Sequence, residues 1–455
     1  MENNTVKDLT VGNPMKLILG FSVPLLFGFL FQQFYNLVDT MIVGRSLGKL
    51  ALAGVGSTGA INFMVIGFCM GVCSGFAIPI AQRFGAKDYD SMRKFVTHSI
   101  MLCSAFAVVM TLLVSIFCRD ILIAMDTPSE SLDYAYDYIF VIFLGIPIIY
   151  MYNLLSGIIR ALGDSKHPVE FLVIASFVNI GLDLLFILVF HMGVTGAALA
   201  TVISQAVSSI CCIVFIVKKV ELLRLKKKDW EIDKSHFFIL LNMGVPMGLQ
   251  YSITAIGSVI LQVAINGQGS DAVAAVTAAG RVGMFFCCPF DALGSTMATY
   301  GGQNVGAKKL DHLSEGLMAA IKLGIVYSIL AFIVLHFIGG TIASLFLSES
   351  DDVVIGYAET FIFWNSLFYI PLAFVNIVRF LIQGMGFSMF AILAGVCEMI
   401  ARVLVALILV PLMGITGISL ASPLAWVFAD IFLIPAFLHV RNKLQMLFDG
   451  EVEKV

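Results

Sequence analysis

Apolar runs of about 20 residues recur along the whole chain and are separated by short polar connections. A run of that length is what an α-helix needs to cross the hydrocarbon core of a bilayer. Charged residues make up 13% of the 455 residues, about half of the roughly 25% found in soluble domains. The chain therefore lacks the charged surface of a soluble protein, and the sequence predicts an all-α polytopic membrane protein.

Twelve apolar runs can be counted. They lie at residues 15–44, 51–82, 95–118, 132–158, 168–191, 194–217, 237–265, 271–303, 315–340, 354–382, 388–411 and 415–439. One long charged connection separates six runs from six. The sequence therefore predicts an N-terminal lobe over residues 1–217, a cytoplasmic linker over 218–235, a C-terminal lobe over 236–440 and a cytoplasmic tail over 441–455.

Lys and Arg are unevenly divided between the two sides of this arrangement. One side holds only Arg45, Lys49 and Arg119. The other holds Lys7, Lys16, Arg83, Lys87, Arg93, Lys94, Arg160, Lys166, the seven basic residues of the linker, Lys308, Lys309, Arg379, Arg441, Lys443 and Lys454. Because basic loops remain in the cytoplasm, both termini are expected there. The first apolar run is expected to be an uncleaved first span and not a targeting segment, which suits a multi-pass protein of a bacterial inner membrane.

Several phrases of the sequence occur twice. HMGVTGAALAT at residues 191–201 returns as LMGITGISLAS at 412–422, and the Gly-Ala-Lys turn at 85–87 returns 221 residues later at 306–308. Six spans precede each return, so both copies run in the same direction. The sequence predicts two pseudo-symmetric six-helix bundles related by an axis along the membrane normal, which is a transporter architecture.

Acidic residues inside the spans are expected to have a function or a partner, because each costs at least ~2.5 kcal/mol in the bilayer. Asp39 and Asp183 lie roughly 9 Å and 12 Å from the outer ends of their spans at 1.5 Å of rise per residue. Asn179 is one helical turn before Asp183, and Thr201 of the next span lies at a similar depth. Such oxygen atoms suit a small cation or a shared proton. The alternative is private pairing, of Asp39 with Asn36 and of Asp183 with Asn179.

Further polar residues inside the spans are candidates for a substrate cavity. They are Gln32, Asn36, Gln250, Thr254, Ser258, Gln262 and Asp291. Hydrogen bonds between helices would explain most of them equally well. Glu398 and Arg402, four residues apart, predict a buried structural ion pair.

Motifs of catalysis are missing from the sequence. It contains no phosphate-binding Walker loop, no HExxH and no serine-protease-like spacing. The chain is therefore expected not to be an enzyme, to use no cofactor and to bind no nucleic acid.

Several stretches together resemble the MATE (multidrug and toxic compound extrusion) family. They are VPLLFGFLFQQFYNLVDTMIVG, AQRFGAKD, GGQNVGAKK, RALGDSKHP and NIGLDLLFILVFHMGVTGAALAT. The resemblance implies two six-helix lobes in a V shape and drug efflux driven by a proton or sodium gradient. Carried over by motif, it implies a cation site at Asp39, Asn179, Asp183 and Thr201, which would hold Na⁺ if the protein is sodium-coupled.

The chain departs from the NorM-type branch of that family, which has acids in spans 7 and 10. Here no acid lies between Pro246 and Ser270, and none follows Glu359 in span 10. A cation site of that type is therefore not expected in the C-terminal lobe.

The sequence thus predicts H⁺- or Na⁺-coupled antiport of small organic, drug-like molecules, with organic cations as the expected substrates and membrane lipid as the surroundings. One alternative is a flippase-type exporter of a lipid-linked precursor or another amphiphile, for which extra helices and a strongly basic cavity are expected. A channel or scaffold is a third class, but it would not need deep acids on converging helices.

Overall fold

The computed structural model describes residues 6–125, 127–346 and 352–450, and every regular element in those ranges is a helix. Ten helical segments are long and apolar enough to cross a membrane. They are α1 (Pro14–Leu47), α3 (Gly59–Gly85), α4 (Tyr89–Ile116), α8 and its π-helical end (Lys166–Val189), α9 (Gly193–Lys219), α10 (Lys234–Asn266), α11 (Ser270–Gly306), α12 (Leu310–Ser344), α15 to α16 (Met389–Met413) and α17 (Ile415–Phe448).

Two further spans are helix pairs, each bent by 50°. They are α6 (Leu132–Leu144) with α7 (Ile146–Ala161), and α13 (Asp352–Leu367) with α14 (Tyr369–Gly384). In each pair a proline lies in the first turn of the second helix: Pro147 is the second residue of α7, and Pro371 is the third residue of α14. Proline has no N–H to continue the preceding helix, so the bend follows from the sequence. Counting each pair as one span gives up to twelve, and the predicted fold class is confirmed.

Other boundaries differ from the sequence prediction. The predicted span 51–82 is divided at Thr58 into α2 (Lys49–Ser57) and α3, and a short α5 (Cys118–Ala124) follows α4. At the C-terminal end, α17 continues to Phe448 through the beginning of the predicted tail.

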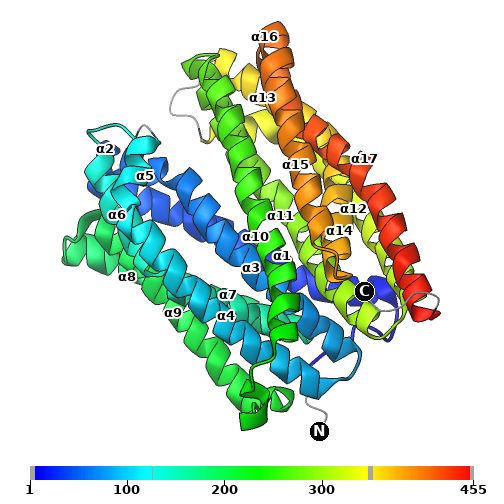
Figure 1. The fold of residues 1–455 in the computed structure, drawn as a ribbon. Coiled ribbons are helices and arrows are strands. Elements are labelled where there is room, and N and C mark those ends of the chain that lie inside the picture. The colour runs from blue at the N-terminus through cyan, green and yellow to red at the C-terminus, as the bar shows by residue number, and fades with distance from the viewer. Residues whose placement is uncertain (1–5, 126, 347–351, 451–455) are drawn as a thin grey trace. The chain divides into compact units, whose positions relative to one another are not determined.

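The backbone forms two compact units that do not follow the halves of the sequence (Figure 1). The first unit comprises residues 1–8 and 27–251, and the second comprises 9–26 and 252–455. Both α1 and α10 are therefore divided: the beginning of α1 belongs to the second unit and the beginning of α10 to the first. The predicted lobe boundaries at residues 217 and 236 stay a prediction about the duplicated sequence.

In the first unit, α3 packs against α4 and α7, and α9 packs against α6, α7 and α8. Glycines bring α3 close to the beginning of α10. A Cβ on Gly71 or Gly75 would meet the α10 backbone at Met247 and Gly244, and one on Gly248 would meet the Phe68 ring. Small residues four apart allow such close approach of helices in lipid.

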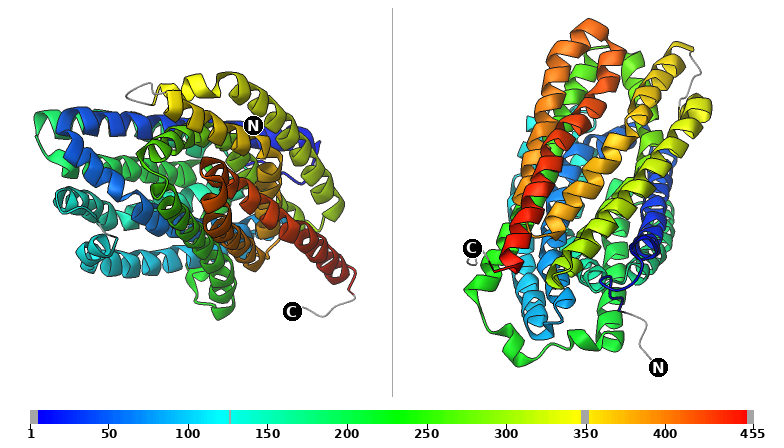
Figure 2. Two further views of the ribbon diagram at one scale, coloured as in Figure 1. Left: turned by 90° about the horizontal axis from the view of Figure 1, so that it is seen from above. Right: turned by 90° about the vertical axis from the view of Figure 1, so that its right-hand side faces the viewer.

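In the second unit, α11 packs against α12, α13 and α14, and α15 lies beside α17 (Figure 2, right). The N-terminal segment is fixed to the turn between α11 and α12. The Leu9 N–H donates to Gln303 Oε1 at 2.8 Å, and Lys309 Nζ donates to the Thr10 carbonyl at 2.7 Å. These bonds place residues 9–12 in the second unit.

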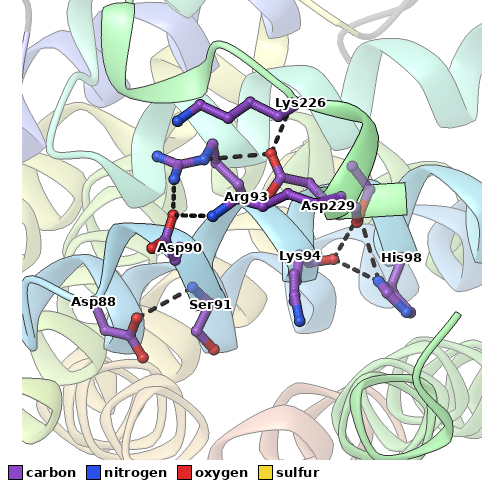
Figure 3. Close-up of polar contacts among 10 residues, drawn as sticks. Asp88, Asp90, Ser91, Arg93, Lys94, His98, Lys226 and Asp229 are labelled. Atoms are coloured by element: carbon purple, nitrogen blue, oxygen red, sulfur yellow. Dashed lines mark hydrogen bonds and ion pairs between the residues drawn. The ribbon is translucent and has the colours of Figure 1, made fainter. Parts of the chain in front are cut away.

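The linker is more ordered than its charge predicts. Helix α9 continues to Lys219, and two 3₁₀ turns, Glu221–Leu223 and Lys227–Trp230, precede α10. Asp229 is fully buried against α4. Figure 3 shows Arg93 of α4 between Asp90 and Asp229, with an Arg93 Nε to Asp229 Oδ2 distance of 3.4 Å. The charged linker is therefore not solvated over its whole length.

His98 of α4 contacts the linker four residues further on, at Asp233. Its Nδ1 lies 2.7 Å from the Lys94 carbonyl, and its Nε2 accepts from the Asp233 N–H at 3.0 Å. The ring thus carries its proton on Nδ1. The Ser235 N–H, which donates to Asp233 Oδ1 at 2.8 Å, lowers the pKa of that carboxyl. The C-terminal half of the linker is thus bound to α4 through both Asp229 and Asp233.

Asp229→Ala should lower the stability of the protein by about 3 kcal/mol, because it leaves Arg93 without its buried partner. It also removes the acceptor of the Lys226 N–H. The measurement is the melting temperature of the purified protein in detergent. Glu231→Ala, at an exposed position two residues away, should leave that temperature nearly unchanged. Equal melting temperatures of the two variants would contradict a stabilising role for the contact between Asp229 and Arg93.

Candidate functional site

The repeated phrase HMGVTG is the turn that brings α8 and α9 together. His191 (φ 53°) and Gly193 (φ 63°) adopt left-handed backbone conformations after the π-helical end of α8. A Cβ on Gly196 would meet Phe186 at 3.0 Å, so the small residue lets α9 return close to α8. The second copy has its own left-handed residue, Gly414 (φ 56°). The turn makes the two polar faces of α8 and α9 meet.

Those faces carry three of the predicted cation ligands. Asn179 and Asp183 of α8 are 1% and 0% exposed. In the orientation that satisfies its neighbours, the Asn179 amide donates to Asp183 Oδ2 and accepts from the Thr201 N–H, both at 3.3 Å. Thr201 Oγ1 also lies 3.5 Å from the amide. An amide thus joins the carboxyl of one helix to the hydroxyl-bearing residue of the next.

Asp39 of α1 supplies the second carboxyl group. It belongs to the part of α1 in the first unit, and its carboxyl lies within hydrogen-bonding reach of the Asp183 carboxyl. Oδ1 of Asp39 and Oδ1 of Asp183 are both buried, and neither has a hydrogen-bond donor in the described residues. Two ionised carboxylates only accept hydrogen bonds and repel one another. This arrangement is satisfied by a proton or a small cation between them.

The four predicted residues are therefore neighbours, on α1, α8 and α9 of one unit. No hydrogen bond joins Asp39 to Asn36 within the described part of the chain, and Asn36 is exposed. Two tyrosines surround the acid pair: Tyr35 and Tyr138 lie within electrostatic range of both carboxyls. The sequence analysis missed these tyrosines, although Tyr35 is one helical turn before Asp39 on the same face. That the group binds a cation stays a prediction.

The predicted substrate-cavity residues are divided between the two units. Gln32, Asn36 and Gln250 are in the first unit, whereas Thr254, Ser258, Gln262 and Asp291 are in the second. Ser258 donates to the Thr254 carbonyl at 3.1 Å, and Gln262 to Asn266 Oδ1 at 2.9 Å. Asp291 is exposed on α11. Their role in a cavity stays a prediction.

The predicted pair of Glu398 and Arg402 exists, with Arg402 Nη2 3.3 Å from Glu398 Oε2. Glu398 also pairs with Arg379 of α14. Arg379 is 6% exposed, so it is packed between helices, and its sequence-based placement on the cytoplasmic side stays a prediction. Asp430 of α17, which the sequence analysis missed, lies within electrostatic range of Arg379. With Asp430 ionised the cluster is neutral, which supports a structural role.

A family model, MatE, matches residues 24–185 and 246–408 of the chain. The chain belongs to the MatE family. One matched segment lies in each half of the duplicated sequence of this MatE protein, and the predicted family is confirmed.

Relatives of the MatE protein are named as transporters and resistance proteins. It is 29% identical over 357 residues to the "Probable multidrug resistance protein YoeA" of Bacillus subtilis, and the match covers 77% of each chain. It is 23% identical over 422 residues to a protein of Shewanella oneidensis named "FAD transporter", covering 90% of this chain and 91% of that protein.

A solved structure described as the "outward-facing conformation of a multidrug resistance MATE family transporter of the MOP superfamily" is similar over nearly the whole MatE protein. Its TM-score is 0.89 at 25% identity, and the match covers 98% of this chain and 99% of that chain. The MatE protein is thus a multi-pass membrane protein of a transporter family.

Proposed function

We propose that this MatE protein is a secondary active exporter. It couples the entry of H⁺ or Na⁺ to the efflux of small organic, drug-like molecules across the cytoplasmic membrane, with both termini in the cytoplasm. The observation that supports the proposal is the buried pair of Asp39 and Asp183, whose Oδ1 atoms lack donors in the described residues. An acid pair of this kind needs a positive charge, and a gradient can supply and remove it.

The coupling ion acts here as a transported substrate. With no cation bound, the two carboxylates repel one another across a buried site. A proton or Na⁺ between them removes that repulsion and favours the arrangement in which α1 lies against α8. Release of the ion favours separation. A ligand can shift such an equilibrium only by its differential affinity for the two states, and the acid pair provides that difference.

Asn179 and Thr201 are positioning residues in this proposal. Asn179 is bonded to Asp183 and Thr201 at once, so it fixes the carboxyl of α8 relative to α9. Its carbonyl and the Thr201 hydroxyl are the further oxygen ligands that Na⁺ would use. A proton needs only the two carboxyls, whereas Na⁺ would use the carbonyl and the hydroxyl as well. The four residues therefore suit either ion.

The substrate class is proposed from the relatives. One is named a probable multidrug resistance protein and another an FAD transporter, so both drug-like cations and a dinucleotide belong in the test. Organic cations are the expected substrates of this chain. An exporter of lipid-linked precursors or other amphiphiles is the alternative.

The proposal is tested with the purified protein in liposomes that carry either an imposed pH gradient or an imposed sodium gradient at equal membrane potential. Ethidium is the cationic probe and FAD the anionic one. One gradient is expected to drive ethidium movement and its collapse to stop it. Equal rates with and without both gradients would overturn coupled transport, and movement of FAD alone would overturn the cationic substrate class.

A further inference from the structure

A pocket of 320 Å³ lies in the second unit, between the later turns of α12 and the first turns of α13. It is lined by Leu335, His336, Gly340, Glu359, Thr360 and Phe363. All six belong to one unit and to helices long and apolar enough to lie in a membrane. The acids and amides of the coupling site belong to the other unit, so this pocket is a separate feature.

The Glu359 carboxyl is directed toward α12 by the absence of a side chain at Gly340. A Cβ built on Gly340 would overlap the Glu359 side chain, and one on Gly339 would meet Ile362 at 3.0 Å. Two adjacent glycines therefore let α13 approach α12 and leave room for a carboxylate between them. No ion pair to Glu359 is formed by any of the described residues.

Aromatic rings form the wall beside this carboxylate. The Phe363 ring centroid lies 6.0 Å from that of His336 and 5.9 Å from that of Phe332, and Phe332 stacks on His336 at 18°. Ring faces attract cations, and the attraction grows when water is excluded. Glu359 is exposed on α13, and a carboxylate at a lipid-facing surface with no ion-pair partner is costly in a membrane. Both features favour a positively charged ligand.

We propose that this pocket binds the ammonium group of an organic amine. Glu359 is the counter-ion, the Phe363 ring packs against the alkyl groups next to the nitrogen, and the Thr360 hydroxyl accepts a hydrogen bond. Thr360 Oγ1 donates to the Gly356 carbonyl at 2.9 Å, which leaves its lone pairs available. The volume is at the lower end of small-molecule sites, so the pocket suits an ammonium group with one ring or a short chain.

An apolar remainder of the ligand would lie along α12. Phe337 and Ile333, next to the pocket on that helix, are 77% and 45% exposed. Such surface in a membrane helix contacts acyl chains, which makes an amphiphilic amine the best match. Two sources carry this chemistry: the headgroup of phosphatidylethanolamine, and a free amphiphilic amine.

The site is tested with the full-length protein in nanodiscs of phosphatidylglycerol, a lipid without an ammonium group. The probe is ¹⁴C-phenethylammonium, measured by equilibrium dialysis against empty nanodiscs. We expect a saturable component of binding whose affinity falls about tenfold or more in Glu359→Gln, since a charge-assisted contact is removed. Phe363→Leu should weaken binding by a smaller factor.

Three controls make the result decisive. Glu315→Gln, an exposed acid at the other end of α12, should bind like the wild type. Asp137→Asn, an exposed acid of α6 in the other unit, should also bind like the wild type; because this assay imposes no gradient, failure of the coupling proposal is distinguishable from failure of this one. Phenethyl alcohol, the neutral analogue, should not displace the probe. Unchanged affinity in Glu359→Gln, or displacement by the alcohol, would overturn the ammonium site.

The two sources are separated by repeating the titration in nanodiscs that contain phosphatidylethanolamine. If the headgroup is the natural ligand, it competes, and half-saturation shifts to higher probe concentration in the wild type only. If a free amine is the ligand, the two lipid compositions give the same affinity. Either outcome supports the proposed chemistry, whereas absence of saturable binding in both compositions contradicts it.

Discussion

Replacing Asp183 by Asn should reduce gradient-driven efflux by about tenfold or more, within the range of coupling free energies between linked sites. An amide cannot take up or lose the coupling proton and offers Na⁺ no negative charge. Asp39→Asn should have the same effect, because the two carboxyls act as one pair. The measurement is ethidium efflux from liposomes under the gradient that drives the wild-type protein.

The same variants should fold and insert normally. Removing one of two neighbouring buried carboxylates relieves repulsion, so the melting temperature should stay equal or rise. Asp137→Asn, which changes an exposed acid of α6 in the same unit, is the matched control and should transport like the wild type. Wild-type efflux in both Asp39→Asn and Asp183→Asn would refute the coupling site.

Gly75→Ala should strongly reduce the amount of folded protein. The added Cβ would lie 2.5 Å from the Gly244 Cα and 2.6 Å from the Met243 carbonyl oxygen. Backbone atoms cannot turn away as a side chain can, so α3 and α10 would have to separate. Overpacking of this kind costs about 1–3 kcal/mol or more. The measurement is the melting temperature and the monodisperse yield in detergent.

Gly280→Ala is the matched control for that substitution. Gly280 is an interior residue of α11, and nothing lies within 4 Å of a Cβ built there. Alanine is the better helix former by about 1 kcal/mol, so this variant should melt at the same temperature or higher. Similar losses in the two variants would contradict the close approach of α3 and α10 as the cause of the loss in Gly75→Ala.

The spans were predictable because a bilayer requires long apolar helices, and the two bends follow from Pro147 and Pro371. The neighbours of each helix were not predictable, since spacing along one helix does not show which helix it faces. The sequence gives no sign that Arg379 of α14 is buried, because its partner Glu398 lies on another helix. The same applies to Asp229, whose partner is on α4.

The proximity of the candidate-site residues was predictable in part. Asp39, Asp183 and Thr201 could be grouped because helical rise converts sequence position into membrane depth, and equal depth is a condition for meeting. Depth does not show which way a side chain points around the axis of its helix, however. The contact of Asp39 with Asp183 and the bridging orientation of Asn179 depend on how α1, α8 and α9 are rotated, which the structure supplies.

The division of α1 and α10 between the units bears on how the protein is made. Residues 234–251, which complete the first unit, are translated after all of α2 to α9, and residues 9–26 are made long before the remainder of the second unit. The first bundle therefore cannot finish packing until the ribosome has passed residue 251. A gene fragment encoding only one copy of the repeat would produce a bundle without one of its helical segments, and duplication within one polypeptide is what makes both bundles complete.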